Sequence, residues 1–291
     1  MEYVLLAIAT LASTTKALAW KKIGSQEQKG ARLHLINAMI FLVAALTVLI
    51  VGLCMKEILL PSGITILLGV LYALFSALTQ IAYIRAMGMG EASITQLVYS
   101  LGILLPIAYG AIFLKEGISP MQYVGVALVT LALFFIASPR SGGKFSFPWL
   151  FMSLLSACGS GAIAITQKMH QSSSAKVELQ TFVFISLIFS AIISILMYFV
   201  SHKKNASSYK KMDKKYVLFL IFCGLCIAIL NLSTSMCAGL LPSVIQFPVY
   251  NIGSMVLVGV LGYFLMKEKL TRSKLIGFGI GCVAILLIGL F

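Results

Sequence analysis

The chain has 291 residues, of which 60% are hydrophobic and only 10% are charged, and its mean hydropathy is +1.03. Soluble domains carry roughly 25% charged residues, so this composition excludes a soluble globular protein and indicates an integral membrane protein. The net charge of +14 is not arranged as a basic stripe with interleaved aromatic residues, so it does not indicate a nucleic-acid partner. Lys and Arg at membrane edges, next to anionic lipid headgroups, explain it instead.

Ten apolar runs follow one another along the chain. Each is close to the roughly 20 residues that a helix needs to cross a bilayer, and the runs are too long and too uniformly apolar for the strands of a barrel. We interpret the first run as a permanent span, because no basic region precedes it and Lys21 and Lys22 follow it. The predicted fold is an all-α integral membrane protein with ten transmembrane helices. They are expected at about 2–20, 33–55, 63–84, 92–114, 120–138, 148–167, 178–200, 216–237, 241–266 and 273–291.

A short motif occurs twice, as "FLKEGIS" after the fourth run and "FLMKEKLT" after the ninth. Lys115 and Glu116 of the first copy recur as Lys267 and Glu268 of the second. Further upstream, "SITQLVYSLG" in the fourth run parallels "SVIQFPVYNIG" in the ninth. Apolar helices share composition by chance, but polar residues and glycines in the same order at the same place indicate a true repeat.

The repeat predicts two halves of five helices each, residues 1–140 and 146–291. The connecting segment 138–148, "SPRSGGKFSFP", has the Pro, Gly and Ser expected of a linker. Because each half has an odd number of spans, the second half enters the membrane upside down. This is an inverted-topology repeat, an arrangement that recurs in transporters.

Each half closes its fourth helix with (L/M)KE(G/K)(I/L)(S/T), and a glycine, Gly125 or Gly277, stands six residues after the Ser or Thr. This pattern resembles the EamA-type transporters of the drug/metabolite transporter superfamily, over nearly the whole chain. The resemblance implies a secondary transporter that works by alternating access, with a central cavity between the halves and no cofactor. Members of the family move amino acids and other metabolites, nucleotide sugars, sugar phosphates or drugs, many of them outward. The expected location is a cell membrane, as a multi-pass protein of a bacterial inner (cytoplasmic) membrane.

The repeated Lys-Glu pair has two interpretations. It is either a gate or coupling site, or the point where the fourth helix of each half reaches water. In the second case, which we favour, Ser119 or Thr271 caps the next helix and Pro120 is well placed as a first helical residue.

The acidic residues, eight in number, all fall in loops or at helix ends. Small multidrug-resistance transporters of the same superfamily rely on a carboxylate buried in the membrane. This sequence has no candidate for that role, which disfavours proton-coupled export of lipophilic cations.

One basic residue lies inside a span. Lys16 is six residues before Lys22 and therefore about 9 Å deeper in a helix. An ionisable group within a span is by default a functional hypothesis, and its ammonium group would attract a carboxylate or phosphate of a solute. The alternative is that its long stem snorkels to the headgroups.

Neutral polar residues occur in the third, fourth, sixth, eighth and ninth spans. Many amides and hydroxyls in hydrocarbon simply bond across helices. The fourth and ninth spans, however, carry the same Gln and Tyr pattern and contain Pro106 and Pro248, and interrupted helices in corresponding halves are the usual indication of a substrate site. The predicted substrate-binding residues are Lys16, Gln80, Tyr83, Gln96, Tyr99, Asn231, Gln246, Tyr250 and Asn251.

No enzyme site is recognisable. His34, His170 and His202 have no ligand spacing, and the six cysteines are interpreted as small packing residues in spans. We therefore predict no catalytic residue, no metal and no cofactor, with membrane lipids and a small solute as partners. A membrane scaffold or lipid-handling subunit, a multidrug exporter and a channel remain alternatives.

The tenth span contains Gly277-x-x-x-Gly281, which predicts either a homodimer contact or close packing against the helix of Gly125. Orientation stays open. Of the 22 Lys and Arg residues, 17 belong to the odd-numbered connections, which places those connections in the cytoplasm and both termini outside. The resemblance implies termini inside.

Overall fold

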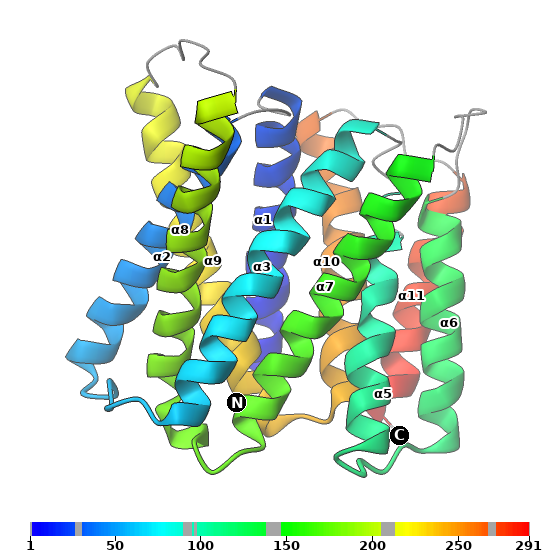
Figure 1. The fold of residues 1–291 in the computed structure, drawn as a ribbon. Helices are drawn as coiled ribbons and strands as arrows, with labels where there is room; N and C mark the ends of the chain where they lie inside the picture. The colour runs from blue at the N-terminus through cyan, green and yellow to red at the C-terminus, as the bar shows by residue number, and fades with distance from the viewer. Residues whose placement is uncertain are drawn as a thin grey trace.

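The computed structural model describes residues 2–26, 31–89, 95, 98–137, 147–204, 213–266 and 272–290 (Figure 1). All the regular secondary structure in these residues is helical. The elements are α1 (Glu2–Gln26), α2 (Ala31–Cys54), α3 (Gly63–Met89), η1 (Leu101–Ile103), α5 (Leu104–Ile112), α6 (Pro120–Ala137), α7 (Phe147–Gln171), η2 (Lys176–Glu178), α8 (Leu179–Lys204), α9 (Lys214–Leu240), α10 (Ser243–Met266) and α11 (Arg272–Leu290).

Seven helices of the described residues are long and apolar enough to cross a membrane. They are α1, α2, α3, α7, α8, α9 and α10. Three shorter apolar helices, Val98–Ile112, Pro120–Ala132 and Leu275–Ile288, stand at the other predicted spans. The all-helical membrane fold therefore holds, whereas the count of ten transmembrane helices stays a prediction.

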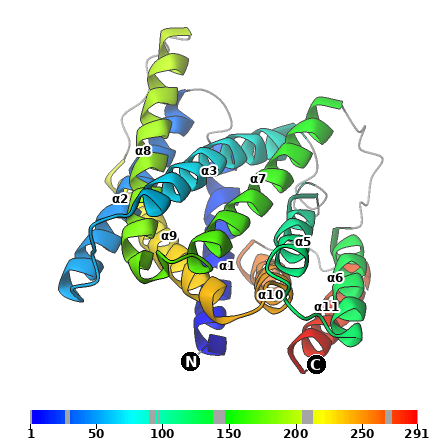
Figure 2. The same cartoon turned by 60° about the horizontal axis from the view of Figure 1, so that its bottom comes forward.

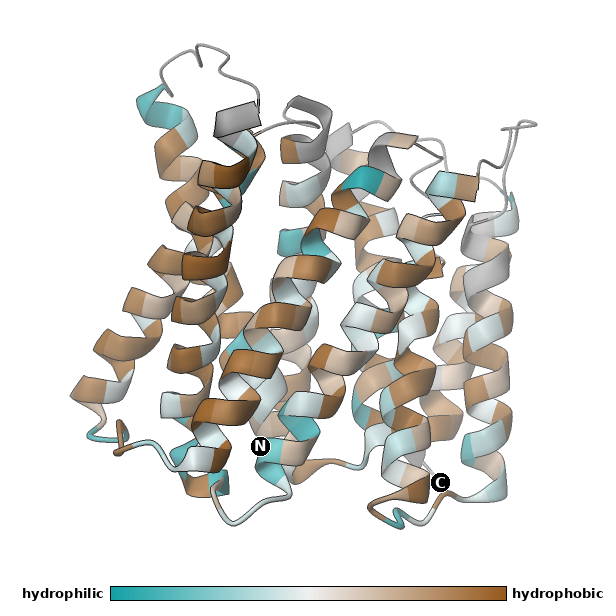
Figure 3. Ribbon diagram, in the orientation of Figure 1, coloured by the Kyte–Doolittle hydropathy of each residue, from teal (hydrophilic) through white to brown (hydrophobic). Residues whose placement is uncertain are grey.

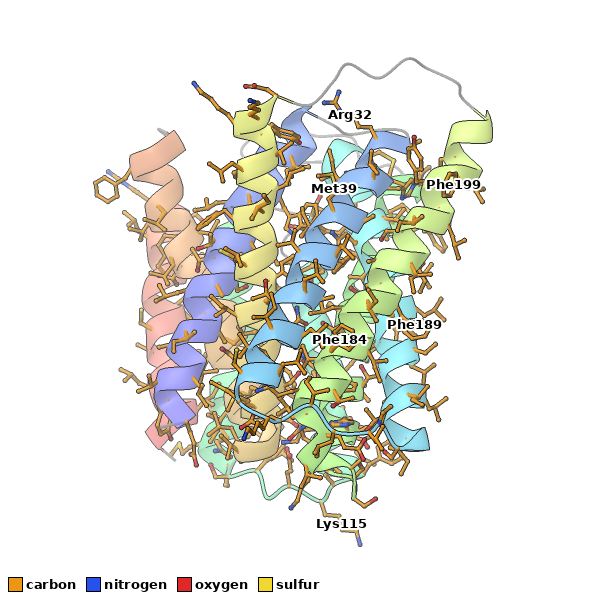
Figure 4. The ribbon with its side chains drawn as sticks, turned by 90° about the vertical axis from the view of Figure 1, so that its left-hand side faces the viewer. Arg32, Met39, Lys115, Phe184, Phe189 and Phe199 are labelled. Atoms are coloured by element: carbon orange, nitrogen blue, oxygen red, sulfur yellow. The ribbon has the colours of Figure 1, made fainter. Side chains whose placement is uncertain are left out.

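The outer surface of the bundle is strongly apolar. Hydrophobic residues cover most of the helix lengths and hydrophilic ones gather toward the helix ends (Figure 3). Large side chains such as Phe199, which is 57% exposed, point away from the neighbouring helices (Figure 4). Such extended exposed apolar surface is unfavourable in water and fits a lipid environment.

The bundle has two chemically different ends. The N- and C-termini lie at one end, together with the connections that follow α2, α5, α7 and α9; we call it the terminal end (Figure 1). We call the opposite end the basic end, because the described helix ends there carry basic residues such as Arg32, Arg85 and Lys214. Figure 4 shows Arg32 at the basic end and Lys115 at the terminal end.

Helix packing follows a paired pattern. The α2 helix packs on α8 at one side of the bundle, and α6 packs on α11 at the opposite side (Figure 2). Between them, α3 packs on α7 and α1 packs on α9, while α3 also contacts α8 as α2 contacts α9. If α1, α2 and α3 are exchanged with α7, α8 and α9, and α6 with α11, the same pairs result. Two related five-helix halves would produce this pattern; their boundaries, 1–140 and 146–291, stay a prediction.

Glycines of α6 and α11 contact other helices of the same chain. A Cβ atom on Gly125 would be 2.5 Å from Ile288 Cγ1, and one on Gly281 would be 2.9 Å from Ile252 Cγ2. Gly277 and Gly281 are both buried. Packing inside the chain therefore accounts for this pair of glycines, and the homodimer contact through them stays a prediction.

The start of α6 matches the sequence expectation. Pro120 is its first residue, the Gln122 N–H donates to Ser119 Oγ at 3.2 Å, and the Ser119 N–H donates to Gln122 Oε1 at 3.0 Å. This reciprocal pair is a capping box. The corresponding Thr271 lies outside the described residues.

Candidate functional site

A cavity lies in the middle of the bundle, between its two apolar clusters. One wall contains Phe41, Tyr72 and Ile227 of the cluster built on α2, α3, α8 and α9, and the other contains Ile103 and Phe247 of the cluster built on α5, α6, α10 and α11. The cavity has a volume of about 110 Å³. In this conformation it is smaller than usual small-molecule sites, which measure roughly 300–1,000 Å³. The polar residues of the lining are Lys16, Tyr72, Ser76, Gln80, Tyr99, Ser160, Gln167, Asn231, Thr234, Gln246, Tyr250 and Asn251.

The structure brings most of the predicted site residues together. Tyr83 is not part of the lining, but its ring packs on Tyr99 with a centroid separation of 4.7 Å. Gln96 lies outside the described residues. The predicted residues that line the cavity are Lys16, Gln80, Tyr99, Asn231, Gln246, Tyr250 and Asn251.

Both interrupted helices contribute to the cavity. The chain is α-helical at residues 98–100, changes to a 3-10 turn at Leu101–Ile103 and continues as α5 with Pro106 in its first turn. In α10, Pro248 lies inside the helix, where it removes the donor that would bond the Val244 carbonyl. Gly102, Pro106 and Phe247, at or beside these interruptions, all line the cavity.

Lys16 is the single charged side chain of the described cavity lining. It lies on α1, and within the described residues no carboxylate is within ion-pair distance of it. The side chain therefore presents an uncompensated ammonium group to the cavity. Its place in the lining favours the cavity interpretation over the snorkelling alternative.

Two hydrogen-bonded pairs orient the polar side chains of α3. The Tyr72 hydroxyl donates to Asn231 Oδ1, and Asn231 Nδ2 donates in turn to the Ile227 carbonyl oxygen at 2.8 Å. About two helical turns further along α3, Gln80 Nε2 donates to Asn37 Oδ1 at 3.0 Å. These bonds fix the rotamers of the wall before any solute enters.

The side-chain amide of Gln246 forms a hydrogen bond through its nitrogen but not through its oxygen. Its Nε2 donates to the Thr234 carbonyl oxygen at 2.8 Å, and its neighbour Gln167 donates to Thr234 Oγ1 at 3.0 Å. Gln246 is 1% exposed, and its Oε1 has no hydrogen-bond partner among the described residues. A buried acceptor without a partner is costly, and this oxygen is almost wholly covered in the structure.

Sequence analysis missed Tyr72, Ser76 and Gln167. Tyr72, Ser76 and Gln80 follow one another at intervals of four residues, so these three side chains share one face of α3. That spacing was present in the sequence and could have identified the pair. For Gln167 no comparable signal exists, because it stands at the polar end of its helix beside Lys168.

The two residues of the first Lys-Glu pair, Lys115 and Glu116, lie in different environments. Lys115 is exposed, as expected at a water interface, but the side chain of Glu116 is only 15% exposed and forms an ion pair with Lys168, with Nζ to Oε1 at 2.8 Å. The helix ends just before this pair, as we expected, but the Glu116 side chain points inward instead of into water. Lys168, which stands one residue beyond the predicted span 148–167, lies buried in the last turn of α7.

Comparison with known proteins decides the family. The EamA-like transporter family model matches residues 2–138 and again residues 147–290. The chain belongs to the EamA-like transporter family. It is therefore a multi-pass membrane protein of a transporter family, within the drug/metabolite transporter superfamily that the motifs indicate.

The fold of this EamA-like transporter is also found among solved structures. One crystal structure matches with a TM-score of 0.78 and 14% sequence identity, over 99% of this chain and 97% of the other. At that identity the likeness establishes the fold alone. No curated protein matches.

The hydrogen bond between Tyr72 and Asn231 should contribute about 1 kcal/mol to the free energy of unfolding of this EamA-like transporter. Tyr72→Phe removes the hydroxyl and leaves Asn231 Oδ1 without its donor. We expect a lower thermal unfolding temperature of the purified protein in detergent. The matched control is Tyr123→Phe, because Tyr123 is 60% exposed on α6. Equal unfolding temperatures of the two variants would contradict the assigned role of the bond.

Proposed function

We propose that the chain is a secondary transporter, an exporter or exchanger, that carries small polar metabolites such as amino acids across the membrane by alternating access. The observation that carries this proposal is the central cavity of an EamA-like fold, lined by polar side chains that surround one uncompensated cation. The proposal includes a location in a bacterial cytoplasmic membrane, where carriers of such metabolites are needed.

The charge of the lining supports a solute with an anionic group. The ammonium of Lys16 would form a charge-assisted hydrogen bond with a carboxylate or phosphate, and such bonds are about twice as strong as neutral ones. A lipophilic cation, in contrast, would meet Lys16 and find no carboxylate among the described lining residues. This disfavours the multidrug-exporter alternative.

The acceptor on Gln246 supports a solute that also has a hydrogen-bond donor. An N–H or O–H group of the solute would satisfy the unpartnered Oε1 and recover the cost of its burial. The rings of Tyr99, Tyr250 and Phe247 offer apolar faces that can cover a side chain of the solute. Amino acids combine all three features: an anionic group, a donor and a variable apolar portion.

The architecture supports alternating access. Helix pairs that map onto one another when the halves are exchanged are expected of a carrier that alternates between two related arrangements. The interrupted helices place free backbone groups beside the cavity, as in carriers with inverted repeats. A channel would need neither feature.

A ligand panel tests the proposal. The purified protein is heated in detergent with pooled amino acids, sugar phosphates, nucleotide sugars or lipophilic cations. A ligand at 100 times its dissociation constant stabilises the native state by about 2.7 kcal/mol. We expect one anionic or zwitterionic pool to raise the unfolding temperature in a concentration-dependent manner. Stabilisation by the cations alone would overturn the assigned chemistry, and no stabilisation by any pool would favour the scaffold or lipid-handling alternative.

A further inference from the structure

A buried ion pair joins distant parts of the chain at the terminal end. Glu116 stands in the connection between α5 and α6, and Lys168 in the last turn of α7. Their charged atoms are 2.8 Å apart, and the side chains are 15% and 6% exposed. Neither is therefore a freely solvated surface charge.

Both residues also bond to the connection between α9 and α10. Glu116 Oε2 accepts from the Ser243 N–H at 2.8 Å, and Lys168 Nζ donates to the Leu241 carbonyl oxygen at 2.7 Å. Two charged groups thus tie three elements together: the α5–α6 connection, α7 and the α9–α10 connection.

The geometry of α5 provides the space for this contact. The Glu116 N–H bonds to the Gly110 carbonyl oxygen at 3.0 Å, which folds the connection back on the helix. A Cβ atom on Gly110 would lie 2.3 Å from Glu116 Oε2. Only glycine at this position lets the carboxylate reach Ser243 and Lys168 together.

This network lies directly below the cavity. Lys168 follows Gln167 and is one helical turn from Ala164, and both of those residues line the cavity. Ser243 is three residues before Gln246, another lining residue. The ion pair and its two backbone bonds therefore lie on the terminal side of these lining residues, and we call them the floor of the cavity.

Stability alone does not explain a buried ion pair. The desolvation cost of burying two charges often exceeds their attraction, so apolar residues would hold a permanent contact at least as well. A contact that must break and form again is different, because separated charges regain their hydration when the floor opens.

We propose that Glu116 and Lys168 form a latch that closes the cavity at the terminal end and opens in each transport cycle. This inference rests on the proposed alternating access. In the first copy of the repeated Lys-Glu motif, it assigns a gating role to Glu116. Lys115, which is exposed, has no part in it. Glu268, at the same place in the second copy, lies outside the described residues.

Labelling of a cysteine in the cavity tests the latch. Ala164→Cys, in a background without the six native cysteines, is the reporter, and a membrane-impermeant maleimide is added from the side where an N-terminal tag is accessible. We expect Glu116→Gln and Lys168→Met to raise the labelling rate at least about tenfold, because each leaves an unpaired buried charge that disfavours the closed state. Lys115→Gln, the matched control, should label at the original rate.

Two further variants separate a latch from a merely structural contact. The exchange Glu116→Lys with Lys168→Glu restores opposite charges and should return labelling to within about threefold of the original rate. Glu116→Asp keeps the charge but shortens the reach, and should label at an intermediate rate. It serves as the test if the larger changes prevent folding. Unchanged labelling in Glu116→Asp, Glu116→Gln and Lys168→Met would overturn the latch.

The ligand panel keeps this result distinct from the proposed function. If the original protein binds a solute and Glu116→Gln binds it too but labels slowly, only the latch fails. If no solute stabilises the original protein, the proposed function fails, whereas the labelling rates still show whether the pair closes this end.

Discussion

Replacing Lys16 with Met should raise the solute concentration for half-maximal transport about 10- to 100-fold. Met is similar in length and apolar, so the change removes the ammonium group while it keeps most of the volume. Hydrogen bonds to charged groups contribute about 1.5–3 kcal/mol, which corresponds to this range. The measurement is the initial rate of uptake into proteoliposomes over a range of concentrations of the solute found in the ligand panel.

Two variants control this prediction. Lys16→Arg keeps the positive charge and should retain much of the affinity. Lys176→Met removes a lysine that is exposed at the terminal end and should transport normally. If Lys16→Met leaves both flux and affinity intact, Lys16 does not bind the solute and the snorkelling alternative is correct.

Gly102→Ala should destabilise the protein by about 1–3 kcal/mol, the usual cost of overpacking a well-packed contact. A Cβ atom at this position would lie 2.3 Å from the Ala157 carbonyl oxygen and 2.3 Å from Ser160 Oγ. The first obstacle is backbone of α7 and cannot rotate away. The interrupted fourth span would be pushed off α7, beside the cavity that both of them line.

Thermal unfolding in detergent measures this effect, and Gly279→Ala is its control. A Cβ atom on Gly279 meets nothing within 4 Å, so alanine should be neutral there or stabilise the helix by up to about 1 kcal/mol. A Gly102→Ala protein as stable as Gly279→Ala would show that the approach of η1 to α7 is not tight in solution.

The sequence predicted the positions of the helices well because hydrophobic length is set by the membrane. It did not predict the 3-10 turn at Leu101–Ile103, since this segment is apolar on both sides of the turn. Pro106 marks the interruption in the sequence, because it cannot donate to the Gly102 carbonyl four residues earlier. The close approach of Gly102 to α7, in contrast, is a tertiary contact that leaves no periodic signal in the sequence.

The site was partly predictable for a similar reason. Polar residues in an apolar span are conspicuous, so Lys16, Gln80 and Gln246 could be selected one by one. Sequence analysis could not show that Glu116 turns inward, because a carboxylate at a helix end is ordinarily solvated. Its burial depends on Lys168, which is brought to it only by the fold.

Solute counterflow in proteoliposomes tests the central claim most directly. Vesicles that contain the purified protein are loaded with a high concentration of the stabilising solute and diluted into a trace of the same solute in radioactive form. Alternating access predicts a transient, saturable accumulation of label, which Lys16→Met diminishes and Lys176→Met does not. Label that only equilibrates, with a rate that does not saturate, would contradict alternating access and indicate a channel.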